Sequence, residues 1–130
     1  MIQIVKDSDT RPWFFLQTAH TTYGMWVMET GHLEHLYYGE RITVDSQDPA
    51  SCAPLVIQRG FAPGNTCTYD KEHPHISMED VCLEVGTLGK GDIREPFLEV
   101  RFTDGSVTSD FTFDSYEVLT LKEREQWLQD

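Results

Sequence analysis

Apolar and polar residues in the first third of the chain form short runs that are separated by turn residues. In residues 21–28, Tyr23, Met25 and Val27 fall on one face, the two-residue period of a half-buried strand. Residues 29–32 (ETGH) then predict a hairpin turn. The strands predicted here span residues 2–6, 13–18, 21–28 and 33–38, and residues 41–44 are expected to extend the sheet.

The same period returns in the second half of the chain. In residues 97–102, apolar side chains alternate with Glu99 and Arg101. The pair Asp104-Gly105 that follows is the strongest hairpin signal in the sequence. The strands predicted here span residues 80–85, 97–102, 107–113 and 116–121.

Two stretches do not follow the strand pattern. Residues 45–75 contain four prolines and little periodicity, which is typical of a functional loop or of a packed Ω-loop. Residues 119–130 predict a short helix with Leu121, Trp127 and Leu128 as its apolar members. We therefore expect an all-β antiparallel β-sandwich, one domain over residues 1–130 with a helical tail at 119–130.

Length and composition narrow the class of protein. A chain of 130 residues fits one domain and is too short for a complete (β/α)₈ barrel, which needs about 250 residues. No apolar run reaches the ~18 residues of a membrane span, and the first residues lack the pattern of a signal peptide. The three cysteines are an odd number and form no Cys-x-x-Cys motif, so a reducing, cytoplasmic location is expected.

The charge balance is strongly acidic. Asp and Glu number 22 against 10 Lys and Arg, a formal net charge of −12. Such a surface repels nucleic-acid phosphate and anionic lipid, so neither nucleic acid nor membrane is expected as a partner. A sugar or another protein remains compatible with this charge.

The histidines offer little metal-binding geometry. His32 and His35 are three apart, and such positions on a strand point to opposite faces. His73 and His75 are able to share one side of an extended loop near acidic residues, but a plain solvated loop is the favoured interpretation. The glycine-bearing residues 86–92 lack the phosphate-loop spacing. We expect no metal and no cofactor.

No catalytic motif is recognisable. There is no Gly-x-Ser-x-Gly or His-Glu-x-x-His, and 22 acidic residues make any chosen carboxylate pair uninformative. Some aromatic side chains are candidates either for a sugar-stacking groove or for the core of the sandwich. These are Trp13, Trp26, Tyr37, Tyr38 and Tyr69.

Five segments, taken in order, carry a resemblance to a known family. They are residues 31–42 (GHLEHLYYGERI), 61–66 (FAPGNT), 69–74 (YDKEHP), 89–96 (GKGDIREP) and 104–111 (DGSVTSDF). This series resembles the amino-terminal domain of microbial α-galactosidases of glycoside hydrolase family 36. The likeness covers residues 12–118, and the chain is expected to depart from the family pattern after about Val118.

The resemblance implies a non-catalytic chain. The family's enzymes are several times longer and combine an amino-terminal β-supersandwich, a catalytic (β/α)₈ barrel and a carboxy-terminal β-sandwich. They hydrolyse terminal α-galactosyl groups with retention, through an Asp in a Lys-Trp-Asp element of the barrel. Here Trp13, Trp26 and Trp127 precede Phe, Val and Leu, so no catalytic residue carries over.

One family feature does carry over to specific positions. In the family, the amino-terminal domain lends a loop carboxylate to the galactose subsite shortly after the strand that ends in Leu-Tyr-Tyr-Gly. Here either Asp45 or Asp48 corresponds to it. The resemblance also implies a catalytic barrel of a parent or partner chain as partner, an α-galactoside as an indirect ligand, and a homo-oligomer.

Two other functions are compatible with the sequence. A free-standing carbohydrate-binding module would need exposed aromatic side chains on one sheet face. A ligand-free assembly domain would self-associate through an open sheet edge.

Overall fold

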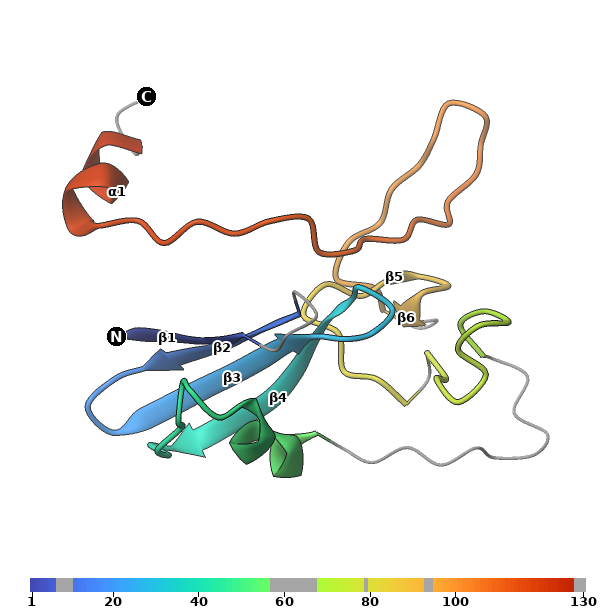
Figure 1. Cartoon of the computed structure of the whole chain (residues 1–130). Helices are drawn as coiled ribbons and strands as arrows, with labels where there is room; N and C mark the ends of the chain where they lie inside the picture. Colours follow the sequence, from blue (N-terminus) through green and yellow to red (C-terminus); the bar gives the residue numbers. More distant parts are fainter. Residues whose placement is uncertain (7–10, 57–67, 79, 93–94, 128–130) are drawn as a thin grey trace.

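The computed structural model is built on a four-stranded antiparallel sheet (Figure 1). It describes residues 1–6, 11–56, 68–78, 80–92 and 95–127. The strands are joined in the order β1-β2-β3-β4, so each strand pairs with its neighbours along the chain. Their bounds are β1 (Ile2–Lys6), β2 (Pro12–Gln17), β3 (Thr21–Val27) and β4 (Leu33–Glu40). The predicted all-β, antiparallel architecture is thereby confirmed.

The register of the sheet separates two faces. Trp13 of β2 lies opposite Val5 of β1 and Trp26 of β3, so these three side chains share what we call the inner face. Phe14 and its cross-strand neighbour Met25 point to the opposite, outer face. A one-residue irregularity lies opposite the Gly24/Met25 step, where β4 carries an extra residue.

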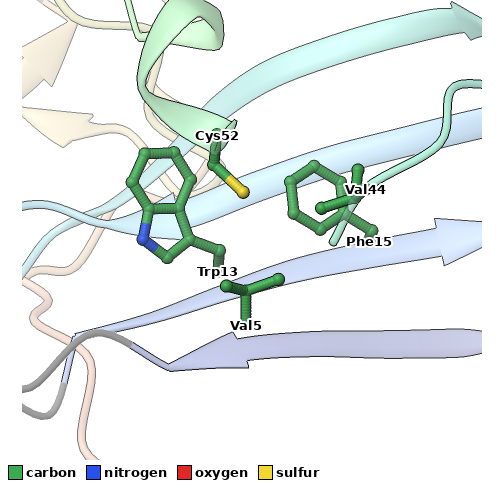
Figure 2. Packing of buried hydrophobic residues seen from close by; sticks show 5 residues of the cluster. All are labelled: Val5, Trp13, Phe15, Val44 and Cys52. Atoms are coloured by element: carbon green, nitrogen blue, oxygen red, sulfur yellow. The ribbon is translucent and has the colours of Figure 1, made fainter. Parts of the chain in front are cut away.

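The main core lies on the inner face, beneath the chain that leaves β4. Figure 2 shows Val5, Trp13 and Phe15 packed against Val44 and Cys52, and all five are buried. Cys52 belongs to the 3₁₀-helix η1 (Pro49–Leu55), whose turn places its thiol between the two rings. Burial raises the pKa of this thiol, with a further contribution from the charge of Asp48, while the hydrogen bond with Ser51 acts the other way.

A second core cluster supports the hairpin between β3 and β4. Met28, Ile76, Met78 and Val81 are buried together, with partly buried Leu83 packed against them. The predicted turn at residues 29–32 is present, since the Met28 N–H donates to the His32 carbonyl at 2.8 Å and Gly31 adopts a φ of 86°. Only glycine adopts that conformation without strain, which explains its place in the turn.

The later strand predictions are largely wrong. Residues 80–85 contribute an isolated bridge, Glu34↔Leu83, to the edge of β4, and residues 41–44 do not continue the sheet. Residues 97–102, 107–113 and 116–121 form no strand, although their apolar alternation is that of one. A strand needs a partner for its backbone groups, and among the described residues these segments have few such partners.

These residues instead form an extended arm. We call residues 97–120 the distal arm: it runs away from the sheet, turns at Asp104-Gly105, and returns above β1 and β2 toward α1 (Figure 1). On its return the arm lies on the outer face, where the Tyr116 ring is 5.1 Å from that of Phe14. The remaining short elements are β5 (Thr87–Leu88), β6 (Gly91–Asp92) and α1 (Leu121–Trp127).

The helix α1 falls inside the tail predicted at residues 119–130. Its start is fixed by a capping box, in which Glu123 accepts hydrogen bonds from the backbone N–H and the hydroxyl of Thr120, both at 2.7 Å. Residues 128–130 lie outside the described part of the chain.

The inner-face core predicts that two phenylalanines contribute very differently to the free energy of unfolding. Phe15→Ala should lower the free energy of unfolding by about 3–5 kcal/mol, because it leaves a cavity beside a fully buried ring position. Phe102→Ala in the exposed arm should change it by about 0.5 kcal/mol or less. Urea unfolding followed by tryptophan fluorescence measures both, and equal losses would contradict this assignment of the core.

Candidate functional site

The loop that carries Asp45 and Asp48 is held firmly to the sheet. Just before it, the side chain of Gln3 donates to the Val44 carbonyl at 2.6 Å, and that of Gln17 donates to the Ile42 carbonyl at 2.9 Å. Both donors come from the inner face, where Val44 itself is buried. The loop therefore begins and ends at buried residues, Val44 on one side and Cys52 on the other.

Each of the two carboxylates organises its own turn. Asp45 Oδ1 accepts the backbone N–H of Gln47 at 2.9 Å, and the Asp45 carbonyl accepts that of Asp48 at 3.2 Å. Asp48 Oδ1 accepts the N–H of Ala50 at 3.1 Å and so caps η1 at its start. The structure thus brings the two predicted residues together at one exposed turn, with a local role for each.

Both carboxylates keep acceptor capacity for a ligand. Among the described residues, Oδ2 of Asp45 and Oδ2 of Asp48 receive no hydrogen bond, and both residues are exposed. An ionised carboxylate accepts hydrogen bonds only, which suits the hydroxyl groups of a sugar. The turn can therefore offer fixed acceptors to a neutral polyhydroxylated ligand.

The candidate aromatic side chains are divided between core and surface. Trp13 and Trp26 stack with ring centroids 4.7 Å apart on the inner face, and the indole N–H of Trp26 donates to the buried Glu34 at 2.7 Å. Tyr37 is half-buried, whereas Tyr38 is 71% exposed. The core interpretation holds for the two tryptophans, and Tyr38 is the member left open to solvent.

A buried histidine connects the β3–β4 hairpin to the distal arm. His32 is 1% exposed, and its Nε2 lies 2.5 Å from Asp110 Oδ1 while its Nδ1 lies 2.7 Å from the Thr30 hydroxyl. The hydroxyl of Tyr69 donates to the other Asp110 oxygen at 2.8 Å. The ammonium group of Lys90 lies 4.8 Å from the centre of the Tyr69 ring.

These contacts shift the pKa values of Asp110 and Tyr69. Burial by itself raises the pKa of Asp110, but the hydrogen bonds from His32 and Tyr69 outweigh it and bring the pKa below its ordinary value. Burial and the hydrogen bond to Asp110 raise the pKa of Tyr69 to about 12. Sequence reasoning missed this cluster because 78 residues separate His32 from Asp110.

A second carboxylate cluster lies on the outer face. The Tyr23 hydroxyl donates to Glu84 at 2.6–2.7 Å, and His35 Nδ1 lies 3.3 Å from the same carboxylate. Burial, and then the hydrogen bond and charge of Glu84, raise the pKa of Tyr23 to about 12. The cluster ties the segment after the second core cluster to β3 and β4.

The histidine pair at 73 and 75 is divided between two carboxylates. His73 Nδ1 lies 2.8 Å from Asp70 Oδ1, whereas His75 contacts Glu29. Within the described part of the chain, no group of three or more His, Cys, Asp or Glu residues has the arrangement of a metal site.

Some of the residues singled out in the sequence lie outside the described ranges. Residues 61–66 lie outside them, as does Arg94 of the segment 89–96. Cys67 is also outside, while Cys52 and Cys82 carry free thiols. In the described residues, no helix has the length and apolar character needed to cross a bilayer.

Comparison with known proteins gives a consistent result. The family model described as "Glycosyl hydrolase family 36 N-terminal domain" matches residues 31–128. The chain is 38% identical over 115 residues to the bifunctional alpha-galactosidase/sucrose kinase AgaSK of Mediterraneibacter gnavus, covering 88% of this chain and 12% of that protein. It is 25% identical over 111 residues to the alpha-galactosidase AgaA of Geobacillus stearothermophilus, covering 85% of this chain and 14% of AgaA.

Solved structures agree with these relatives. The alpha-galactosidase from Lactobacillus brevis superposes with a TM-score of 0.68 at 29% identity, over 87% of this chain and 14% of that chain. The galactosidase domain of AgaSK gives the same score and identity, over 88% and 15%. The chain thus corresponds to a small part of much longer proteins, and the family match continues beyond Val118, where a departure was expected.

The contacts of Asp110 predict an acid-dependent loss of stability. At pH 7, Asp110→Asn should lower the free energy of unfolding by about 1–3 kcal/mol, because it weakens hydrogen bonds to a charged group. Since the folded-state pKa of Asp110 is lowered, its contribution is complete above the ordinary value of 3.8 and is lost as pH falls through the folded pKa. The difference between wild type and variant should therefore shrink below about pH 4.

Urea unfolding at a series of pH values tests this, with Asp114→Asn as the control for an exposed carboxylate on the same arm. A difference between wild type and Asp110→Asn that stays constant down to pH 2 would rule the linkage out.

Proposed function

The chain belongs to the glycosyl hydrolase family 36 N-terminal domain family, and from this we propose that it acts as the non-catalytic amino-terminal β-domain of an α-galactosidase. The observation that carries the proposal is the family match over residues 31–128 together with structural likeness to two α-galactosidase chains. The chain spans between 12% and 15% of the length of these relatives. Hydrolysis of an α-galactoside then belongs to the rest of the enzyme.

The proposed role of this domain is to support the sugar site. Asp45 and Asp48 would present carboxylate oxygens to hydroxyl groups of the bound galactoside. Support comes from the rigid attachment of their loop between Val44 and Cys52, because binding groups on a fixed frame lose little entropy when a ligand arrives. The free Oδ2 atoms described above supply the acceptors.

The domain would pack against the catalytic (β/α)₈ barrel of its parent enzyme and would contribute to a homo-oligomer. A cytoplasmic location is supported by the exposed free thiol of Cys82, since exposed thiols persist in a reducing compartment.

The purified chain alone should be inactive. Incubated with p-nitrophenyl α-galactoside, it should release nitrophenol no faster than a protein-free blank, because no Lys-Trp-Asp element is present in the sequence. Release above the blank that follows the chain through purification would refute the non-catalytic assignment.

The two loop carboxylates should affect substrate binding in an assembled enzyme. Substrate binding can be measured in a chimera in which this chain replaces the matching segment of the M. gnavus relative. Asp45→Asn and Asp48→Asn keep the turn and the helix cap, since asparagine accepts the same backbone hydrogen bond, but they remove the charge. At least one of them should raise KM for a galactoside about tenfold, the effect of losing about 1.4 kcal/mol of binding energy.

Asp104→Asn is the matched control, because Asp104 forms a similar turn, accepting the N–H of Ser106 at 2.9 Å, but belongs to the turn of the distal arm rather than to the loop between Val44 and Cys52. If both loop variants behave like Asp104→Asn, the sugar-site role is wrong.

A further inference from the structure

One residue in the chain that leaves β4 is bound through both of its backbone polar groups. The Ile42 N–H donates to the Thr22 hydroxyl at 3.1 Å, and the Ile42 carbonyl accepts the side-chain N–H of Gln17 at 2.9 Å. Gln17 and Thr22 lie directly opposite each other in the register of β2 and β3. A cross-strand pair of side chains therefore supplies the acceptor and the donor that a neighbouring strand would otherwise supply.

Both side chains of this pair are buried. Gln17 is 6% exposed and Thr22 is 0% exposed. Burying an amide or a hydroxyl costs free energy unless the group is hydrogen-bonded, so the bonds to Ile42 offset the burial of the pair. Ile42 also packs against the inner-face core. Hydrophobic contact is non-directional, whereas bonds to the N–H and the C=O of one residue fix its position and orientation on the sheet.

The fixed position of Ile42 extends along the chain to the two loop carboxylates. Asp45 lies three residues after Ile42 in the sequence. Between them, Gln3 of β1 donates to the Val44 carbonyl at 2.6 Å. The Asp45 carbonyl in turn accepts the N–H of Asp48. Because the turn is joined to the sheet through these bonds, a shift of Ile42 is expected to displace both carboxylates.

We propose that Gln17 and Thr22 are positioning residues for the galactoside site. They act through Ile42, whose place on the sheet sets the place of the Asp45–Asp48 turn, and neither residue touches the sugar. A small displacement of a binding group weakens its contacts even when the cause lies away from the ligand. The inference rests on the proposed function, because it requires the loop carboxylates to bind the galactoside.

Removing the hydroxyl of Thr22 provides the main test. Thr22→Val deletes the acceptor and keeps the shape of the side chain. In the chimera with the M. gnavus relative, it should raise KM for p-nitrophenyl α-galactoside about tenfold and leave kcat within about twofold, because the turn contacts sugar hydroxyl groups and not the bond that breaks. Thr22→Ser restores the hydroxyl and should return KM to that of the unmodified chimera.

A second variant and a matched control accompany this test. Gln17→Met removes the donor of the pair at nearly constant side-chain length, and it should raise KM to a similar extent. Thr87→Val is the control, since Thr87 is also a buried threonine, 1% exposed, whose hydroxyl bonds to the backbone, here to the Ser109 carbonyl. That bond lies outside the loop of the two carboxylates, so Thr87→Val should leave KM unchanged.

A double variant separates positioning from a general loss of structure. Thr22→Val is combined with whichever of Asp45→Asn and Asp48→Asn raises KM by itself. In that background it should raise KM by no more than about twofold, because the carboxylate that it displaces has already lost its charge.

Amide exchange in the purified chain tests the positioning without a sugar. The Ile42 N–H should exchange about tenfold faster in Thr22→Val than in the wild type, and the Asp48 N–H, which closes the turn, should also exchange faster. Nuclear magnetic resonance measures both. The amides that pair β2 with β3 serve as the internal reference.

Three outcomes overturn the inference: equal KM values for Thr22→Val and Thr87→Val, a full effect of Thr22→Val in the double variant, or unchanged exchange of the Asp48 N–H in Thr22→Val. The proposed sugar-site role fails differently, through loop variants that leave KM unchanged. In that case, the exchange rates still show whether the Gln17–Thr22 pair positions the turn.

Discussion

The structure depends on the burial of one aromatic layer by the chain that leaves the sheet. Trp13 and Phe15 of β2 need a cover, and residues 42–55 supply it with Val44 and Cys52. The cover stays in place because Gln3 and Gln17, themselves strand residues, satisfy the carbonyls of Val44 and Ile42. Two carbonyls of a backbone segment outside any sheet are thus paired where that segment packs on the core. The position of the Asp45–Asp48 turn follows from this packing.

Local sequence information predicted the first half of the fold well. The four strands of the meander agree with the predicted ranges to within two residues, because alternation and turn chemistry in residues 29–32 point to the same register. The turn at Asp104-Gly105 was also predicted, and Gly105 has the expected positive φ of 88°. In both places the decisive signal lies within a few residues.

The failures arose where the answer depends on distant residues. The alternation in residues 97–102 is compatible with a strand, but a strand also needs a neighbouring strand with which to form backbone hydrogen bonds. Among the described residues, this segment forms only single backbone contacts, such as that of Leu98 with Gly86. The His32–Asp110 pair was missed for the same reason, since nothing near His32 in sequence announces a carboxylate so far along the chain. For the candidate site, the sequence located the loop of Asp45 and Asp48 through family likeness, whereas their capping roles became visible only with the backbone.

Cys52 has a consequence that extends beyond packing. Its thiol is sealed beneath the same segment that positions the two loop carboxylates, and burial disfavours its reactive thiolate form. A thiol-specific reagent can therefore reach it only when residues 42–55 lift from the sheet. The alkylation rate of Cys52 therefore reports how often residues 42–55, which carry the Asp45–Asp48 turn, open away from the sheet.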